Sequence, residues 1–163
     1  MKLPFEINLK DQVAVITGGA RGIGKCIAEK FREAGAVVCV IDLLDNDYFV
    51  GDLSDKLTLE RFASKVISDY GQVDYLINNA APKMCGITNG SYEDFEYALR
   101  VGVTAPFYLA KLFAPHFAKG GSIVNISSVG GAVPDITQVG YGSAKAAINH
   151  LTKMMAVQLG RKG

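Results

Sequence analysis

The sequence has 163 residues, a formal net charge of +1 and a hydrophobic content of 49%. This length suits one domain with a substantial core, and the charge gives no reason to expect nucleic acid or an anionic membrane as a partner. No apolar run approaches the roughly 18 residues of a membrane span, and the first residues lack the apolar stretch of a signal peptide. The three cysteines and two histidines are dispersed, which predicts reduced thiols, no metal site and a cytoplasmic location.

Strands and helices alternate in the first part of the chain. The predicted elements are strands at 12–17, 37–41 and 48–50 and a helix at 23–34. Helical spacing places the apolar residues Ile23, Ile27, Phe31 and Ala34 on one face of that helix, and Gly35 is expected as its C-terminal cap. The segment between the second and third strands is too short for a helical crossover, so we expect a loop there.

The alternation continues to the end of the sequence. The predicted elements are helices at 54–70, 92–117 and 141–159 and strands at 73–77 and 122–127. Ser54 is the expected cap of the first of these helices, and Ser91 with Asp94 resembles a capping box for the second. Gly102 and Pro106 disfavour a helix interior and predict a bend. The whole pattern predicts one α/β domain, residues 1–163, with a Rossmann-like doubly wound parallel sheet in three α/β/α layers.

A glycine-rich turn follows the first strand and opens the first helix. Residues 17–24 read Thr-Gly-Gly-Ala-Arg-Gly-Ile-Gly. Such a turn forms an anion site, because backbone N–H groups and the positive end of the helix point into it. Asp42 ends the second strand at about the spacing where an acidic residue meets the adenosine ribose in dinucleotide sites. A glycine turn in an unrelated α/β protein is the alternative.

Several polar residues are predicted to meet at one edge of the sheet. Ligands of open parallel sheets bind beyond the carboxyl ends of the strands, and the glycine turn, Asp42, Asp52, Asn79 and Ser128 all follow such ends. Tyr141 and Lys145 share one helix face, and a neighbouring ammonium favours a phenolate, which suits tyrosine to acid–base work. The alternatives are a solvated helix face for the tyrosine and lysine and ordinary turn residues for the asparagine and serine.

Together these residues resemble the motifs of the short-chain dehydrogenase/reductase family, over essentially the whole chain from Asp11 onward. The family's cofactor motif is similar to Thr17-Gly18-x-x-x-Gly22-x-Gly24, and its adenine-contact pair is similar to Asp52-Leu53. Its Asn-Asn-Ala-Gly motif is similar to Asn78-Asn79-Ala80-Ala81, with alanine in place of the glycine. The end of its serine strand is similar to Ile126-Ser127-Ser128, and its Tyr-x-x-x-Lys motif is similar to Tyr141-Gly-Ser-Ala-Lys145.

The resemblance implies an oxidoreductase that moves a hydride between a nicotinamide cofactor and an alcohol or carbonyl substrate. Tyr141 would be the general acid/base, Ser128 would hold the substrate oxygen, and Lys145 would assist the tyrosine and bind the nicotinamide ribose. The implied cofactor-binding residues are Gly18, Arg21, Gly22, Ile23, Gly24, Asp42, Leu43, Asp52, Leu53, Asn79, Ala80, Tyr141 and Lys145.

The acidic residue after the second strand decides the expected cofactor. A carboxylate at Asp42 repels a 2′-phosphate and favours NAD over NADP, whereas Arg21 could meet that phosphate. We expect the effect of Asp42 to dominate because it would clash directly. The resemblance further implies a homodimer or homotetramer formed through the long helix and the tyrosine helix.

Two departures from the family pattern stand out. Gly102 occupies the position of a family asparagine that helps to hold a water molecule near the lysine. Family chains also continue past the tyrosine helix with further strands and a substrate-covering loop, so we expect the C-terminal strands to be missing here. Two hypotheses follow: a short or partial NAD-dependent dehydrogenase, and a nucleotide-binding, self-associating fragment with little or no turnover. The second is favoured if an exposed sheet edge promotes association.

Overall fold

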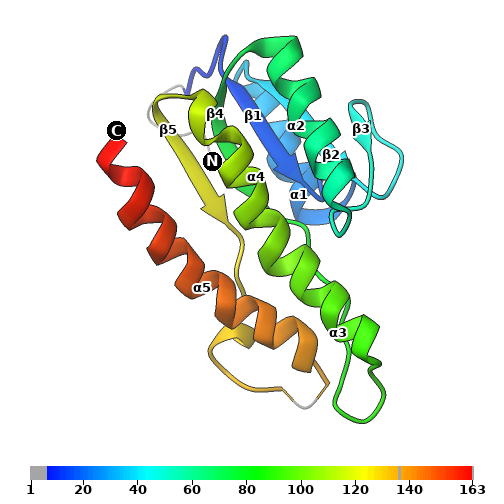
Figure 1. Ribbon diagram of the computed structural model, residues 1–163. Helices are drawn as coiled ribbons and strands as arrows, with labels where there is room; N and C mark the ends of the chain where they lie inside the picture. The colour runs from blue at the N-terminus through cyan, green and yellow to red at the C-terminus, as the bar shows by residue number, and fades with distance from the viewer. Residues whose placement is uncertain (1–6, 136, 163) are drawn as a thin grey trace.

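A computed structural model describes residues 7–135 and 137–162 (Figure 1). Its centre is a five-stranded parallel sheet with the order β3-β2-β1-β4-β5. The strands are β1 (Val13–Thr17), β2 (Val37–Asp42), β3 (Phe49–Val50), β4 (Val73–Asn78) and β5 (Phe117–Asn125). This sheet and its helices confirm the predicted Rossmann-like α/β fold. The predicted domain begins at residue 1, and the prediction that there is no signal peptide concerns the first residues of the sequence. Residues 1–6 lie outside the described part of the chain.

Helices cover both faces of the sheet. They are α1 (Gly22–Glu33), α2 (Lys56–Tyr70), α3 (Tyr92–Leu99), α4 (Ala105–Phe113) and α5 (Val139–Leu159). Figure 1 shows α1 behind the sheet and α2 and α4 in front of it. In the part of the chain that the structure describes, no helix has both the length and the apolar character to cross a bilayer.

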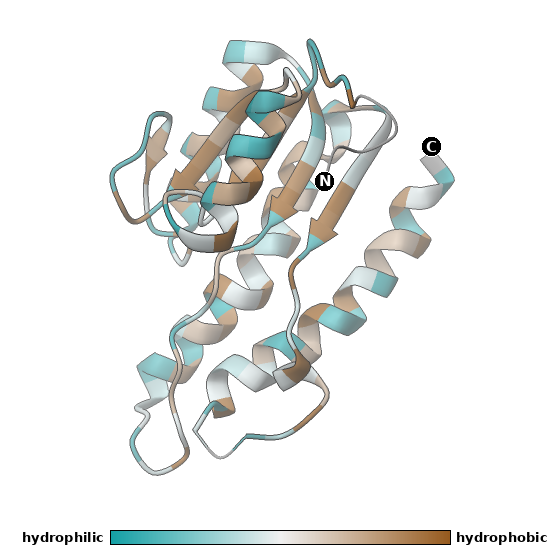
Figure 2. Cartoon of the chain, turned by 180° about the vertical axis from the view of Figure 1, so that it is seen from behind, coloured by the Kyte–Doolittle hydropathy of each residue, from teal (hydrophilic) through white to brown (hydrophobic). Residues whose placement is uncertain are grey.

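The core is divided between the two faces of the sheet. Val15 and Leu76 belong to the larger cluster, with residues of α2, α4 and α5, whereas Ile16 and Ile77 pack with Ala28 of α1. Successive strand residues thus point to opposite faces. Because both faces are covered, the central strands are almost continuously apolar, as the brown strands in Figure 2 show.

The ends of the first two helices differ from the prediction. Ile23 belongs to the predicted apolar face of α1, yet its exposed fraction is 68%, because it lies in the first turn of the helix, beyond the end of β1. The cap of α2 is Asp55 and not Ser54, since the Asp55 carboxylate accepts the backbone N–H groups of Leu57 and Thr58. A carboxylate can accept two such bonds at once, which satisfies two N–H groups that the helix leaves free.

The predicted bend in the long helical segment is confirmed. A π-helical turn (Arg100–Thr104) joins α3 to α4 and contains Gly102. Pro106 follows at the start of α4, where a missing N–H group costs little. The capping box of Ser91 and Asp94 is also present at the start of α3.

The long helical segment ends earlier than predicted, because the prediction extended it to residue 117. Helix α4 ends at Phe113, and a 3₁₀ turn (Ala114–His116) leads into β5, which begins at Phe117 instead of residue 122. Pro115 cannot donate to a helical hydrogen bond and helps to end the helix. At the other edge, β3 has two residues, and the loop before it contains no helix, as predicted.

Candidate active site

A cleft of about 490 Å³ lies beyond the carboxyl ends of the strands. The predicted site residues that line it are Gly18, Arg21, Gly22, Ile23, Gly24, Asp42, Leu43, Leu53, Asn79, Ala80, Tyr141 and Lys145. These residues come from the ends of different strands and from α5. The fold therefore brings the glycine turn, the acidic residue and the tyrosine–lysine pair to one place.

Asn79 fixes the glycine turn against the end of β4. Its backbone N–H donates to Thr17 Oγ1 at 3.0 Å, and its side-chain amide donates to the carbonyl groups of Thr17 and Gly18 at 3.1 and 2.9 Å. Gly18 has a φ of +68°, and a Cβ there would lie 2.8 Å from the Ala80 Cα. Only glycine fits this left-handed, closely packed position.

The N-terminus of α1 has the properties of an anion site. Arg21 precedes the helix, and no side chain caps its first turn. A Cβ added to Gly22 would meet no other atom within 4 Å, so the space beside the turn is open to the cleft. Backbone donors at a helix N-terminus beside such a space fit a pyrophosphate group.

The carboxylate of Asp42 connects the glycine turn to the end of β2. Its Oδ2 atom accepts the Ala20 N–H at 3.0 Å, and Oδ1 accepts the Leu44 N–H at 3.0 Å. These bonds hold the carboxylate at the rim of the cleft in one orientation. A fixed carboxylate is a suitable acceptor for the hydroxyl groups of a ribose.

Lys145 is buried beside Tyr141. The exposed fraction of Lys145 is 4%, and its ammonium group donates to the carbonyl oxygen of Ile126. The Nζ atom lies 5.6 Å from the centre of the Tyr141 ring. Burial lowers the pKa of the Lys145 amine, because removal from water disfavours the charged form.

Two predicted residues, Ser128 and Asp52, do not line the cleft. The Ser128 hydroxyl accepts the Gly130 N–H at 3.1 Å, and a Cβ on Gly130 would lie 3.6 Å from that hydroxyl and 3.5 Å from Tyr141 Cε1. Gly130 therefore lies between the serine and the tyrosine. Ser127 does line the cleft, and its hydroxyl donates to the backbone carbonyl of Lys145 at 3.3 Å.

Sequence reasoning missed several residues of the cleft. They are Leu44, Gly51, Ala81, Tyr97, Val101, Ile126 and Ser127. Ala81, Ile126 and Ser127 belong to the quoted motifs, and Leu44 and Gly51 adjoin predicted residues, so adjacency alone could have identified these five. Val101 lies in the π-helical turn, next to the Gly102 position of the family asparagine, whereas Tyr97 lies in α3 and no motif marks it.

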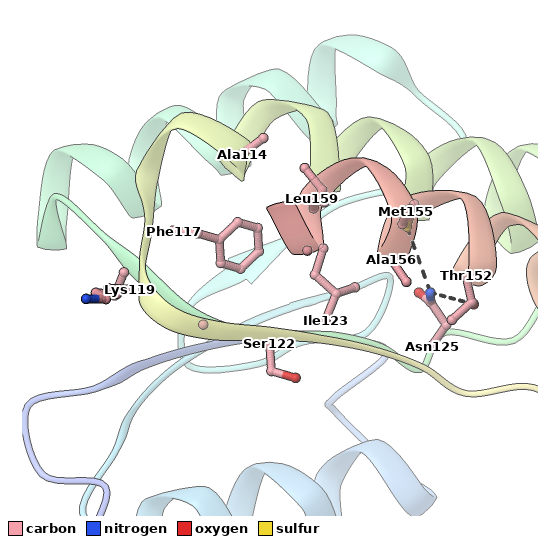
Figure 3. Close-up of a pocket in the computed structure, with 13 residues that line it drawn as sticks. Ala114, Phe117, Lys119, Ser122, Ile123, Asn125, Thr152, Met155, Ala156 and Leu159 are labelled. Atoms are coloured by element: carbon pink, nitrogen blue, oxygen red, sulfur yellow. Dashed lines mark hydrogen bonds between the residues drawn. The ribbon is translucent and has the colours of Figure 1, made fainter. Parts of the chain in front are cut away.

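A second hollow lies between β5 and α5 (Figure 3). Its volume is about 280 Å³, and apolar side chains such as Ile123 and Met155 form much of its lining. Asn125 lies at one end of the lining and donates to Thr152 Oγ1 at 2.9 Å. None of the predicted cofactor or catalytic residues lines this hollow, so the cleft at the strand ends is the candidate active site.

The sequence resembles known proteins along nearly its whole length. A family model described as short chain dehydrogenase matches residues 12–163. Xanthoxin dehydrogenase of Arabidopsis thaliana is 34% identical, over 96% of this chain and 63% of the relative. The 7alpha-hydroxysteroid dehydrogenase of Clostridium sardiniense is 33% identical, over 95% of this chain and 68% of the relative.

Solved structures give the same result. An apo SCOR enzyme from Clostridium thermocellum superposes with a TM-score of 0.85 and 37% identity, over 91% of this chain and 66% of that chain. A short-chain dehydrogenase/reductase from Serratia marcescens has a TM-score of 0.85 and 28% identity, over 94% of this chain and 70% of that chain. The chain therefore belongs to the short-chain dehydrogenase family, which implies a nicotinamide cofactor, NAD or NADP. It spans about two thirds of the length of these relatives.

Proposed function

We propose that the chain, as a single dinucleotide-binding domain, is an oxidoreductase for an alcohol and carbonyl pair, with Ser128, Tyr141 and Lys145 as its catalytic residues. One observation carries this proposal. Tyr141 and Lys145 line the same cleft as the glycine turn and Asp42. Acid–base and anion-binding groups in one cleft at the strand ends are what hydride transfer with a bound dinucleotide requires.

The residues of the glycine turn and Asp42 would hold the adenosine half of the cofactor. The N–H groups at the start of α1 bind the pyrophosphate, and Asp42 accepts from the adenosine ribose. When bound, the nicotinamide ring supplies the hydride acceptor for alcohol oxidation and the hydride donor for carbonyl reduction. Lys145 binds the ribose next to that ring.

Tyr141 would move the proton. During alcohol oxidation its phenolate accepts the proton of the substrate hydroxyl, and during reduction its hydroxyl returns a proton to the carbonyl oxygen. The Lys145 ammonium stabilises the phenolate, and its burial strengthens this effect because little water screens the charge. The hydroxyl of Ser128 holds the substrate oxygen near the Tyr141 ring.

NAD is the proposed cofactor. The Asp42 carboxylate is fixed by two backbone N–H groups, so it cannot easily turn away from a 2′-phosphate placed beside it. Arg21 also lines the cleft and could soften this repulsion, but it would not remove the contact between like charges.

The proposed substrate is a small alcohol or carbonyl compound. The relatives are named for a hydroxysteroid and for xanthoxin, so secondary alcohols that include a 7α-hydroxysteroid form a suitable test panel. We also propose a cytoplasmic homodimer or homotetramer, built through α4 and α5.

The substitution Tyr141→Phe tests the proposal. It should reduce turnover about 10²- to 10⁴-fold and weaken NADH binding, followed by nicotinamide fluorescence, by a much smaller factor, because the other cofactor-binding residues remain. Tyr92→Phe is the matched control, since Tyr92 is 76% exposed on α3. Normal turnover by the Tyr141 variant would overturn the proposed mechanism.

A second candidate function is dinucleotide binding and self-association without turnover. The position of β5 at the edge of the sheet favours it, together with the 44% exposed side chain of Val124 on that strand. An open strand edge readily pairs with another chain. NADH binding without activity on the panel, combined with a mass in sedimentation that rises with concentration, would support this function over the first.

A further inference from the structure

The loop between β4 and α3 contains the one Asn-Gly pair of the sequence, Asn89 and Gly90. Asparagine is among the thermolabile residues of proteins, and Asn89 is exposed to water. Glycine has no Cβ, so the backbone nitrogen of Gly90 can approach the side-chain carbon of Asn89 without obstruction. The pair is therefore open to a reaction between this side chain and the backbone.

The side chain of Asn89 is held in an orientation that favours such a reaction. Its Oδ1 atom accepts the N–H of Gly86 at 2.8 Å. When the Gly90 nitrogen attacks the Asn89 Cγ atom, negative charge develops on this same oxygen. The Gly86 N–H already points at the atom that becomes charged, and a fixed donor in that position stabilises the tetrahedral intermediate, as an oxyanion hole does.

Asn46, which precedes Asp47, has the opposite arrangement. Its side-chain nitrogen donates to the carbonyl groups of Leu44 and Phe49 at 3.0 and 2.9 Å. Its Oδ1 atom accepts the N–H groups of Tyr48 and Phe49 at 3.0 and 2.9 Å. These four bonds hold the amide in place and keep it from turning toward the backbone nitrogen of Asp47. Asn46 is therefore an internal comparison for Asn89.

We infer that Asn89 is a site of spontaneous deamidation, and that its isoaspartyl product releases the loop from the start of α5. The Gly90 nitrogen loses its proton to hydroxide and bonds to the Asn89 Cγ atom, the bond from Cγ to the amide nitrogen breaks, and ammonia leaves. Water then opens the cyclic imide at either of its carbonyl groups, which gives aspartate or isoaspartate. The Gly90 N–H donates to the Gly86 carbonyl at 2.9 Å, so the reaction follows transient opening of the loop.

The two products differ in their effect on the loop. Aspartate keeps the backbone unchanged and still offers an oxygen to the Gly86 N–H. Isoaspartate directs the backbone through the former side chain, which adds one carbon atom before Gly90 and makes the former Oδ1 a backbone oxygen. Both hydrogen bonds that now join Gly86 to Asn89 and Gly90 are therefore lost in the isoaspartyl form.

Gly90 packs against the residue that connects this loop to α5. A Cβ added to Gly90 would lie 2.9 Å from the Cys85 Cβ, and the Cys85 carbonyl accepts the Gly140 N–H at 3.2 Å. A displaced Gly90 therefore moves Cys85 and weakens its bond to Gly140. Because Gly140 lies in the first turn of α5, directly before Tyr141, the modification reaches the edge of the cleft. This inference does not depend on the proposed function.

The first measurement follows the deamidation itself. The folded protein is incubated at mildly alkaline pH, and samples are digested with trypsin. Cleavage after Lys83 and Arg100 gives a peptide, residues 84–100, whose one asparagine is Asn89, and Asn46 is the one asparagine of the peptide 33–56. Mass spectrometry should show the amide converted to a carboxylate about tenfold faster in the first peptide than in the second. Isoaspartyl methyltransferase then detects the isoaspartate.

The second measurement follows the contact with α5. The helix provides no acceptor for an N–H group in its first turn, so hydrogen exchange of the Gly140 amide, measured by NMR, reports its bond to Cys85. Exchange should become about tenfold faster in isoaspartyl protein purified by ion exchange. It should stay slow in freshly prepared Asn89→Asp, which has the charge and an unaltered backbone. Asn89→Ser keeps a side-chain oxygen for Gly86 and should remain unmodified.

Each result decides one part of the inference. Faster conversion in peptide 33–56, or no isoaspartate in peptide 84–100, overturns the assignment of Asn89. Slow exchange of the Gly140 amide in the isoaspartyl protein, or equally fast exchange in Asn89→Asp, overturns the effect on α5. NADH titration tests the proposed function separately, and its failure leaves both measurements valid.

Discussion

Gly102 and Ala144 lie so close together that a Cβ added to Gly102 would come within 2.7 Å of the Ala144 Cβ. The same Cβ would lie 3.2 Å from Pro82 Cγ. This contact presses the π-helical turn against α5, directly beside Lys145. The departure from the family asparagine at this position therefore has a packing reason, since a larger side chain does not fit without movement of the two segments.

Gly102→Ala should destabilise the protein by about 1–3 kcal/mol, the usual cost of an overpacked core. The substitution Ala144→Gly removes the opposing methyl group and should cost about 1 kcal/mol by itself, because glycine is unfavourable within a helix. In the double variant the two costs should partly cancel. Urea denaturation of all four proteins measures the coupling, and strictly additive costs would contradict the contact.

Asp42→Ala should weaken NADH binding by about tenfold or more and reduce the preference for NADH over NADPH. The substitution removes the ribose acceptor and the bonds to the N–H groups of Ala20 and Leu44, so the glycine turn also loosens. Asp42→Asn is the control: it keeps acceptor atoms but removes the charge. Calorimetric titration with both cofactors measures the effect, and unchanged selectivity in both variants would exclude a role in cofactor choice.

Lys145→Met should lower turnover about 10²- to 10⁴-fold and raise the melting temperature at neutral pH. The folded protein holds this amine with a lowered pKa, so the unfolded chain binds more protons between the folded value and the ordinary value of 10.5. Wild-type stability therefore rises with pH in that window. The advantage of the methionine variant should shrink as the pH approaches the upper limit, and melting curves measured across this range check the sign.

Gly140→Ala should reduce turnover, because it disturbs the start of the helix that carries Tyr141. A Cβ at Gly140 would lie 2.6 Å from Cys85 Sγ, and the Gly140 N–H donates to the Cys85 carbonyl at 3.2 Å. We expect about a tenfold loss in kcat with little change in NADH affinity, since the glycine turn is not involved. Adding Cys85→Ala removes the sulfur and should restore part of the rate. No recovery would show that Cys85 is not the obstacle.

The sequence allowed a correct prediction of the fold, and most of the residues that it placed at the strand ends do line one cleft, for one physical reason. In a parallel sheet the carboxyl ends of the strands meet at one edge, so the position of Asp42 or Asn79 after a strand predicts its place in space. Tyr97 could not be found in this way. Its contact with Asp52 depends on where the fold places α3 relative to the end of β3, and neither residue spacing nor a motif records that placement.

The errors in element boundaries have similar local causes. The apolar residue Ile23 fits the helical pattern of α1, yet it lies in the first turn, where the sheet no longer covers it. The early start of β5 at Phe117 depends on the turn around Pro115. A lysine and two glycines follow Phe117, and these residue types do not suggest a strand. Where a helix or strand begins or ends depends on its tertiary contacts, which the periodicity of the sequence does not reveal.

The hydrogen bond between Asn79 and Thr17 joins residues that are 62 positions apart in the sequence. This separation affects when, during folding, the protein becomes able to bind a dinucleotide. The glycine turn lies early in the sequence, but the Asn79 hydrogen bonds that hold it form only when β4 pairs with β1. Closing so long a segment carries an entropic cost and slows this step relative to the pairing of β1 with β2. During refolding, helical structure should therefore form before the protein can retain a dinucleotide.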